Sequence, residues 1–201
     1  MATGAAPAPK RLARKLVAGE DSVMPAPFAV ELVPHDPAWP EMAAAEGRAL
    51  AALLGPCLLA VHHIGSTAIP AICAKPVLDL LPVVTGLAAL EARRAALEAA
   101  GYLWNGEYGL EGRRYCTRDD PETGRRLVQA HFYAEGDAAI ARHLAFRDYL
   151  NAHPAIAQDY ATDKQRCRAL HPDNSHDYSR CKYAWIGRVE AEALIWAADR
   201  R

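Results

Sequence analysis

Two short apolar runs, residues 57–64 and 77–84, constrain the fold of this chain most strongly. Each has the length of a β-strand. Neither shows the alternation of apolar and polar side chains that a strand with one solvated face would have. Strands of this kind are buried on both faces, so other elements must cover them. The sequence therefore predicts a mixed α/β (α+β) fold built on a central sheet.

The flanking segments supply the covering elements. Apolar residues recur at helical spacing in several segments, and glycine or proline punctuates their ends. Two further segments predict an antiparallel pair joined by a turn. We expect a mixed β-sheet backed by helices, with a group of C-terminal helices. The predicted helices are residues 37–54, 87–100, 137–152, 154–170 and 178–198; the other predicted strands are residues 29–33, 102–104, 113–117 and 126–133.

The bulk composition fits one globular domain. The chain has 201 residues, 51% of them hydrophobic, and a formal net charge of −1. We expect a single domain at residues 28–201, preceded by a flexible tail at residues 1–27 that is rich in Ala and Pro. The near-neutral charge argues against nucleic-acid and membrane-surface partners. No apolar run reaches membrane-spanning length, and no secretory signal is evident. These features predict a cytoplasmic protein; its oligomeric state is not indicated.

The cysteines predict reduced thiols. There are five, without the compact spacing of a disulfide framework. Two of them and two histidines provide the ligand types of a tetrahedral zinc site, but their spacing matches no standard zinc pattern. A cysteine in an amphipathic helix is more often a small core residue. This group is Cys167, His171, His176 and Cys181.

A turn of small residues follows the first apolar run. Successive backbone N–H groups in such a turn can cradle a phosphate, and glycine lets the backbone approach the ligand closely. The alternative is an ordinary Ser/Thr turn or helix cap without a ligand. The candidate residues are His63, Gly65, Ser66 and Thr67.

A lone carboxylate, Asp79, lies inside the second apolar run. Burying it there is unfavourable without a cation or several hydrogen-bond donors. It could hold the divalent metal that accompanies a polyphosphate, or it could form a salt bridge with an arginine. The turn and Asp79 together indicate a site for nucleotide phosphates.

Residues 63–70 (His-Ile-Gly-Ser-Thr-Ala-Ile-Pro) and 74–79 (Ala-Lys-Pro-Val-Leu-Asp) resemble the signature of the GrpB family. Later blocks extend the similarity over about residues 30–198. The resemblance implies a nucleotidyltransferase-like fold, and family members also occur fused to dephospho-CoA kinase. The supporting blocks are residues 37–40, 112–115, 131–133 and 146–150, with Tyr160, Lys164, Tyr178 and Lys182 in the last helices.

The resemblance also implies functional residues. Nucleotidyltransferases of this superfamily hold two metal ions with two carboxylates one residue apart and a third on a later strand. Asp79 matches the first carboxylate, Leu81 stands at the second and His131 is near the third. Asp79 and His131 are thus the candidate catalytic residues, and Asp79 is the candidate Mg²⁺ ligand. The candidate phosphate-binding residues are His63, Gly65, Ser66, Thr67, Lys75, Arg113 and Lys182, of which His63 either contacts the ligand or orients the turn.

Two functions follow as hypotheses. The first is an enzyme that transfers a nucleoside monophosphate, or a related phosphoryl group, from a nucleotide to a small acceptor. The alternative is a non-catalytic module that binds a nucleotide or a phosphorylated metabolite. Leu81 favours the alternative, because leucine cannot bind a metal.

Overall fold

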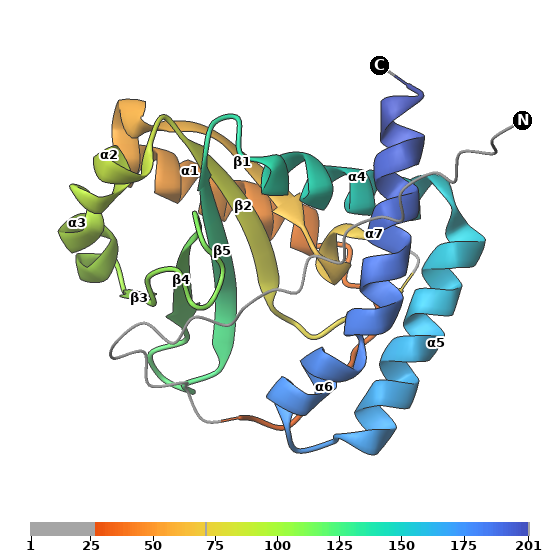
Figure 1. Cartoon of the computed structure of the whole chain (residues 1–201). Helices are drawn as coiled ribbons and strands as arrows, with labels where there is room; N and C mark the ends of the chain where they lie inside the picture. The colour runs from red at the N-terminus through yellow and green to blue at the C-terminus, as the bar shows by residue number, and fades with distance from the viewer. Residues whose placement is uncertain (1–26, 71, 201) are drawn as a thin grey trace, which may run out of the picture.

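A five-stranded mixed sheet forms the centre of the molecule in the computed structural model, which describes residues 27–70 and 72–200 (Figure 1). The strand order is β1-β2-β5-β4-β3. β2 and β5 are parallel, and every other neighbouring pair is antiparallel. The predicted mixed sheet backed by helices is confirmed. The strands are β1 (Leu58–Ile64), β2 (Leu78–Val84), β3 (Tyr102–Trp104), β4 (Arg114–Asp119) and β5 (Arg126–Ala134).

One face of the sheet packs against α1 (Trp39–Leu54) and the short helices α2 (Leu87–Glu91) and α3 (Arg94–Ala99). Leu50 and Leu54 of α1 are fully buried against Leu80 of β2 and Phe132 of β5. These side chains belong to the largest apolar cluster, whose burial is the main stabilising term for a fold of this size. Contacts with α1 thus account for the apolar residues on this face of β2.

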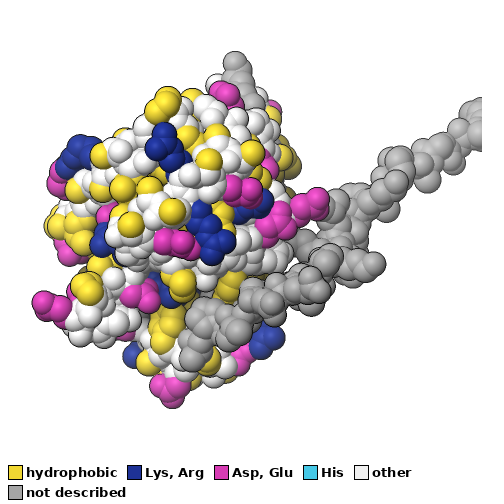
Figure 2. All heavy atoms as spheres, turned by 90° about the vertical axis from the view of Figure 1, so that its left-hand side faces the viewer, with side chains coloured by type: hydrophobic (Ala, Val, Ile, Leu, Met, Phe, Trp, Pro, Cys, Tyr) yellow, Lys and Arg dark blue, Asp and Glu magenta, His cyan; other side chains and the backbone are white. Residues whose placement is uncertain are grey.

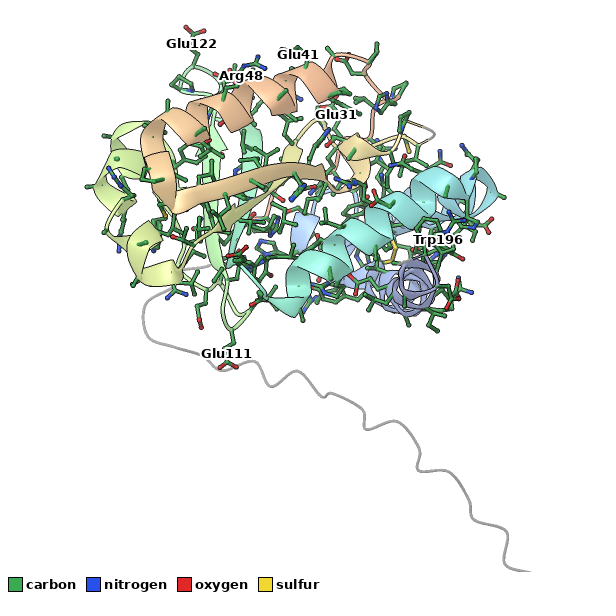
Figure 3. All side chains as sticks on the ribbon, turned by 90° about the horizontal axis from the view of Figure 1, so that it is seen from above. Glu31, Glu41, Arg48, Glu111, Glu122 and Trp196 are labelled. Atoms are coloured by element: carbon green, nitrogen blue, oxygen red, sulfur yellow. A yellow bond between two sulfur atoms is a disulfide. The ribbon has the colours of Figure 1, made fainter. Side chains whose placement is uncertain are left out.

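The opposite face is covered by α4 (Ala138–Ala152). Ile64, Leu81 and Tyr133 form a smaller buried cluster with Ile140 and Leu144 of that helix. Figure 3 shows α1 and α4 on opposite sides of the sheet, with Glu41 and Arg48 pointing outward from α1. Successive strand residues point to opposite faces, so Asp79 shares the α4 side with Leu81.

Three helices follow α4 and form a layer beside the sheet: α5 (Pro154–Leu170), α6 (Ser175–Cys181) and α7 (Tyr183–Ala198) (Figure 1). Leu150 of α4, Tyr160 of α5 and Val189 of α7 bury one another. Ile69 and Ile72, from the segment between β1 and β2, complete this cluster. The β1–β2 connection is therefore held against the C-terminal helices.

Three predicted elements differ from the structure. Residues 29–33 form only an isolated bridge, Val33 with Ala74, instead of an edge strand. Residues 87–100 form two short helices, and residues 178–198 are divided at Lys182 between α6 and α7. Neither interruption contains a proline or a glycine, so local sequence did not reveal them.

The prediction that all cysteines are reduced thiols is wrong for one pair. Cys167 and Cys181 form a disulfide, with a Cα–Cα distance of 5.7 Å, whereas Cys57, Cys73 and Cys116 are free. Both sulfurs of the possible zinc group are therefore bonded to each other, and His171 and His176 have no thiolate beside them. Spacing in the sequence did not reveal the pairing because the two cysteines meet through the packing of α5 and α6.

Acidic and basic side chains are interspersed on the face that carries α2, α3 and β3 (Figure 2). This mixture matches the net charge of −1. No helix within residues 27–70 and 72–200 combines the length and apolar character that a membrane crossing needs. The predicted tail, residues 1–27, lies almost wholly outside the described residues.

Candidate functional site

A pocket of about 130 Å³ lies where the β1 turn, the beginning of β2 and helices α5 and α6 meet. It contains both features that the sequence singled out, the small-residue turn and Asp79. The two apolar runs therefore do bring these groups together. The lining residues are Gly65, Ser66, Thr67, Lys75, Val77, Asp79, Tyr160, Lys164, Tyr178 and Lys182.

Gly65 fixes the distance between the turn and the carboxylate. Ile64 pairs with Asp79 across the β1–β2 ladder, so the next residue passes directly over the Asp79 side chain. A Cβ atom at Gly65 would lie 2.8 Å from Asp79 Cβ and closer still to its carboxylate. The backbone there, at φ 69° and ψ −167°, is in a region that only glycine readily adopts. Both constraints require glycine.

Ser66 and Thr67 begin a single turn of 3₁₀-helix, residues Ser66–Ala68. Its first hydrogen bond runs from the Ala68 N–H to the Gly65 carbonyl, so the preceding N–H groups are not needed by the turn. Thr67 is buried, and its hydroxyl lies 2.8 Å from His63 Nε2. This contact supports the turn-orienting role of His63, and its contact with a ligand stays a prediction.

Three lysines from separate parts of the chain line the pocket. Lys75 precedes β2, Lys164 lies on α5, and Lys182 lies at the junction of α6 and α7. Lys164 is 1% exposed and donates a hydrogen bond to the Cys73 carbonyl. Lys182 Nζ lies 4.3 Å from the centre of the Tyr178 ring, and Lys75 Nζ lies 5.8 Å from the same ring. Lys164 Nζ lies 5.2 Å from the centre of the Tyr160 ring, so an aromatic face lies beside each of the three ammonium groups.

Burial disfavours the charged form of all three lysines. Burial lowers the pKa of Lys182 to about 7, and repulsion from Lys75 and Lys164 adds to the effect. Burial likewise lowers the pKa of Lys164 to about 8 and lowers that of Lys75. The Asp79 carboxylate acts in the opposite direction on the pKa of all three lysines. A negatively charged ligand would relieve the remaining repulsion.

Asp79 is connected to a second charged group through His131. His131 Nε2 lies 3.6 Å from Asp79 Oδ1, and Arg113 Nη1 lies 3.3 Å from His131 Nδ1. A guanidinium can only donate, so Nδ1 accepts and the proton of the neutral imidazole is on Nε2, facing Asp79. Arg113 is buried and also donates to the carbonyls of Glu107 and Tyr108.

The structure therefore separates the predicted site residues. Gly65, Ser66, Thr67, Lys75, Asp79 and Lys182 line the pocket. His63, His131 and Arg113 do not line it; His63 supports the turn, and the other two lie behind Asp79.

Tyr160, Lys164 and Tyr178 also line the pocket; the sequence places them in the C-terminal blocks that resemble the family, although they are not among the predicted phosphate-binding residues. One signal for Lys164 was present in the sequence: it belongs to a stripe at helical spacing whose other members are buried small or aromatic residues. A lysine in a buried stripe requires an electrostatic explanation. The stripe is Ala157, Tyr160, Ala161, Lys164 and Cys167.

The donor set does not fit the two-metal site of the superfamily. Among the described lining residues Asp79 is the one carboxylate, and Leu81, at the position of the second, is fully buried beneath α4. His131 does not line the pocket, and its Nε2 lies 3.6 Å from Asp79 Oδ1. Within the part of the chain that the structure describes, no group of three or more His, Cys, Asp or Glu side chains could hold a metal ion.

Replacing Gly65 by alanine tests the geometry of the turn. The Cβ atom would collide with Asp79 and strain the backbone, so we expect a loss of at least about 2 kcal/mol in the free energy of unfolding. Urea denaturation would measure it. Gly86→Ala is the matched control, since Gly86 has an extended backbone and open space at its Cβ position. Equal stability of Gly65→Ala and wild type would contradict this account.

Comparison with known proteins places this site in a family. Residues 29–192 match the family described as GrpB protein. YqkA of Bacillus subtilis is 40% identical over 171 residues, which cover 85% of this chain and 49% of YqkA. The chain thus spans about half the length of that relative. A dephospho-CoA kinase of Mycolicibacterium paratuberculosis is 28% identical over 84% of this chain and 47% of the kinase.

The crystal structure of the conserved protein GrpB from Enterococcus faecalis has the same fold. It superposes with a TM-score of 0.77 at 38% sequence identity, covering 83% of this chain and 99% of that one. The match over residues 29–192 includes the turn, Asp79 and all three pocket lysines. This chain belongs to the GrpB family.

Proposed function

We propose that this protein binds the phosphate groups of a phosphorylated small molecule, such as a nucleotide, in the lysine pocket. The observation that carries the proposal is the gathering of Lys75, Lys164 and Lys182 around one carboxylate. One buried and two half-buried ammonium groups repel one another, and a multiply charged anion bound between them would relieve that repulsion. Strongly perturbed titratable groups in a pocket are typical of functional sites.

The size of the pocket supports a phosphate ligand. Its volume of about 130 Å³ is below the roughly 300–1,000 Å³ that sites for whole drug-sized ligands occupy. A phosphate chain fits that volume, whereas a complete nucleotide does not. In this arrangement the phosphates lie among the lysines and the Ser66 side of the turn, and the remainder of the ligand projects outward.

Lysines hold the anion in this proposal, without a metal ion bound by the protein. The charge that two divalent ions would supply comes from ammonium groups, which bind phosphate oxygens as donors. Asp79 keeps the lysines charged and is not itself an anion ligand. This role explains how a single carboxylate is compatible with a phosphate site.

Binding of inorganic triphosphate with and without Mg²⁺ tests this function. We expect micromolar-range or tighter binding by isothermal titration that persists in excess EDTA, because lysines supply the positive charge. Asp79→Asn should keep this EDTA-resistant binding. If the metal instead mediates binding, both EDTA and Asp79→Asn will abolish it, and the lysine-held site is wrong. Thermal shifts measured with AMP, ATP and coenzyme A then rank these ligands.

Lys182→Met tests whether Lys182 lowers the stability of the folded chain while it contributes to anion binding. The unfolded chain holds the Lys182 proton up to an ordinary pKa near 10.4, whereas the folded chain releases it at about 7. Between about pH 7 and pH 10, unfolding is therefore accompanied by uptake of a proton at Lys182. Lys182 lowers the free energy of unfolding most at and below about pH 7, and this effect disappears as the pH approaches about 10. We expect the variant to have a higher Tm than wild type at about pH 7, a gap that narrows toward about pH 10, and no triphosphate binding.

Arg93→Met is the matched control for Lys182→Met. It removes the same charge from an exposed position between α2 and α3, away from the pocket. Its Tm should stay close to that of wild type, and triphosphate binding should be unchanged. A Lys182→Met variant that binds triphosphate as wild type does would contradict the proposed site.

Transfer of a nucleoside monophosphate is the second candidate function, and the position of Asp79 favours it. Asp79 lies against the turn, in the same pocket as the lysines, where it could accept the proton of an acceptor hydroxyl. The hydroxyl oxygen would then form a bond to the α-phosphorus as pyrophosphate leaves, its charge balanced by the lysines. His131 would hold the Asp79 carboxylate in position.

Release of pyrophosphate from nucleoside triphosphates distinguishes this candidate from binding alone. A transferase should release pyrophosphate when its acceptor is present. Asp79→Asn should abolish that release while triphosphate binding remains, because the proton acceptor is lost and the lysines are kept. Binding without release across a panel of hydroxyl, phosphate and amine acceptors would favour the non-catalytic module.

A further inference from the structure

The disulfide lies beside two of the pocket lysines. Cys167 follows Lys164 by one helical turn on α5, and Cys181 immediately precedes Lys182. The bond therefore ties the helix that carries one lysine to the α6–α7 junction that carries another. Tyr178, whose ring lies beneath Lys182, packs with Cys167 in the same small buried cluster.

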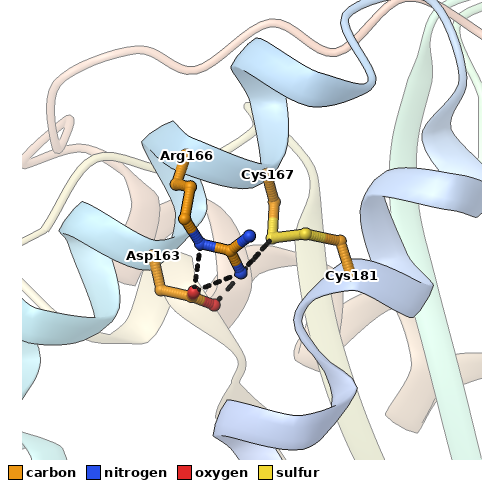
Figure 4. The surroundings of a disulfide bond; sticks show 4 residues. All are labelled: Asp163, Arg166, Cys167 and Cys181. Atoms are coloured by element: carbon orange, nitrogen blue, oxygen red, sulfur yellow. Dashed lines mark hydrogen bonds and ion pairs between the residues drawn. A yellow bond between two sulfur atoms is a disulfide. The ribbon is translucent and has the colours of Figure 1, made fainter.

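The two sulfurs differ in access and in electrostatic surroundings. Cys167 is fully buried, whereas Cys181 is partly exposed. Arg166 Nη2 lies 3.3 Å from Cys167 Sγ and is held by Asp163 at 2.7 Å, as Figure 4 shows. A nearby guanidinium stabilises a thiolate and makes it a better leaving group. The Asp163 carboxylate, whose Oδ2 lies 3.9 Å from Cys167 Sγ, partly offsets the effect of Arg166. The greater access to Cys181 Sγ therefore favours attack at Cys181, with Cys167 as the leaving group.

From this geometry we infer that Cys167–Cys181 is a thiol–disulfide exchange site that controls anion binding in the lysine pocket. A reducing dithiol attacks Cys181 Sγ with one thiolate, the S–S bond breaks, and Cys167 leaves as a thiolate beside Arg166. The second thiol of the reductant then attacks the mixed disulfide and releases the Cys181 thiolate. Two electrons pass from the dithiol, which becomes a disulfide, to the protein, which becomes a dithiol.

Reduction loosens the lysine arrangement because α6 is short. A helix of seven residues is not stable on its own, so α6 depends on its contacts with neighbouring elements. The disulfide is the covalent contact that holds its C-terminal end against α5. Without it, Lys182 and Tyr178 are less firmly placed, and the pocket binds a phosphate chain more weakly. This inference rests on the proposed anion-binding function.

Triphosphate titration of the oxidised and dithiothreitol-reduced full chain tests the coupling. We expect reduction to weaken binding by roughly tenfold or more, the effect of losing one charge-assisted contact. Hydrogen exchange of residues 175–186 should become faster on reduction, with or without ligand. Thiol titration of the denatured chain should rise from three free thiols to five, since Cys57, Cys73 and Cys116 are already free.

Variants assign the effect to this pair of cysteines. Cys181→Ser should bind like the reduced wild type and should not respond to dithiothreitol, whereas Cys57→Ala, far from the pocket in the α1 core, should keep the full response. Arg166→Gln should slow reduction severalfold because the leaving thiolate loses its cation.

The possible failures are distinguishable. Tight binding by the oxidised chain that is unchanged on reduction, with unchanged hydrogen exchange, overturns the redox coupling and leaves the phosphate site intact. Five thiols in the air-oxidised chain also overturn it. Absence of triphosphate binding in both forms instead overturns the proposed function.

Discussion

The antiparallel register of β1 and β2 determines where the Gly65 turn and Asp79 lie in the pocket. Because Ile64 pairs with Asp79, the chain leaves β1 directly above the carboxylate, and the first residue of the turn must be one without a Cβ atom. A one-residue slip would move Asp79 to the opposite face of the sheet, where α1 packs. The apolar faces of β1 and β2 fix the register, so burial of the core also places the acid.

The C-terminal helices contribute the positive charge to a site that the sheet begins. Lys164 and Lys182 come from elements more than 80 residues beyond the turn in the sequence, and they reach it because Ile69 and Ile72 of the β1–β2 connection are buried among these helices. Apolar packing between the connection and α4, α5 and α7 supplies the free energy that offsets crowding three ammonium groups together. The apolar cluster around Ile69 and Ile72 thus provides the stability that keeps the three lysines close together.

The sequence predicted the parts of this structure that depend on local pattern. Strands β1 and β2 follow from continuous apolar runs, and β2 is buried as predicted, whereas β1 lies at the edge of the sheet with Leu59 exposed. The presence of Ser66 and Asp79 in one pocket follows from a turn and a carboxylate at neighbouring strand ends. The missed features depend on tertiary packing. The helix break at Lys182 has no glycine or proline to mark it.

The sequence likewise does not reveal the direction of the Arg113 side chain. The family resemblance predicts a phosphate contact for Arg113, and its guanidinium carbon lies 4.8 Å from the centre of the Tyr115 ring. Its hydrogen bonds nevertheless go to His131 and to the carbonyls of Glu107 and Tyr108, on the side of Asp79 away from the lysines. The residue type was informative, but its direction depended on the β4–β5 pairing of Tyr115 with His131.

The arrangement of charge across the site gives the bound ligand a direction. Asp79 and the three lysines line the same pocket, and His131, which does not line it, has its Nε2 atom 3.6 Å from Asp79 Oδ1. A phosphate chain is attracted to the ammonium groups and repelled by the carboxylate, so we expect the neutral or hydroxyl-bearing part of a ligand to face Asp79. Arg113, placed behind His131, balances the carboxylate without adding a fourth cation to the phosphate side. The charges that orient a bound molecule would therefore also place an acceptor hydroxyl beside Asp79, which could take its proton.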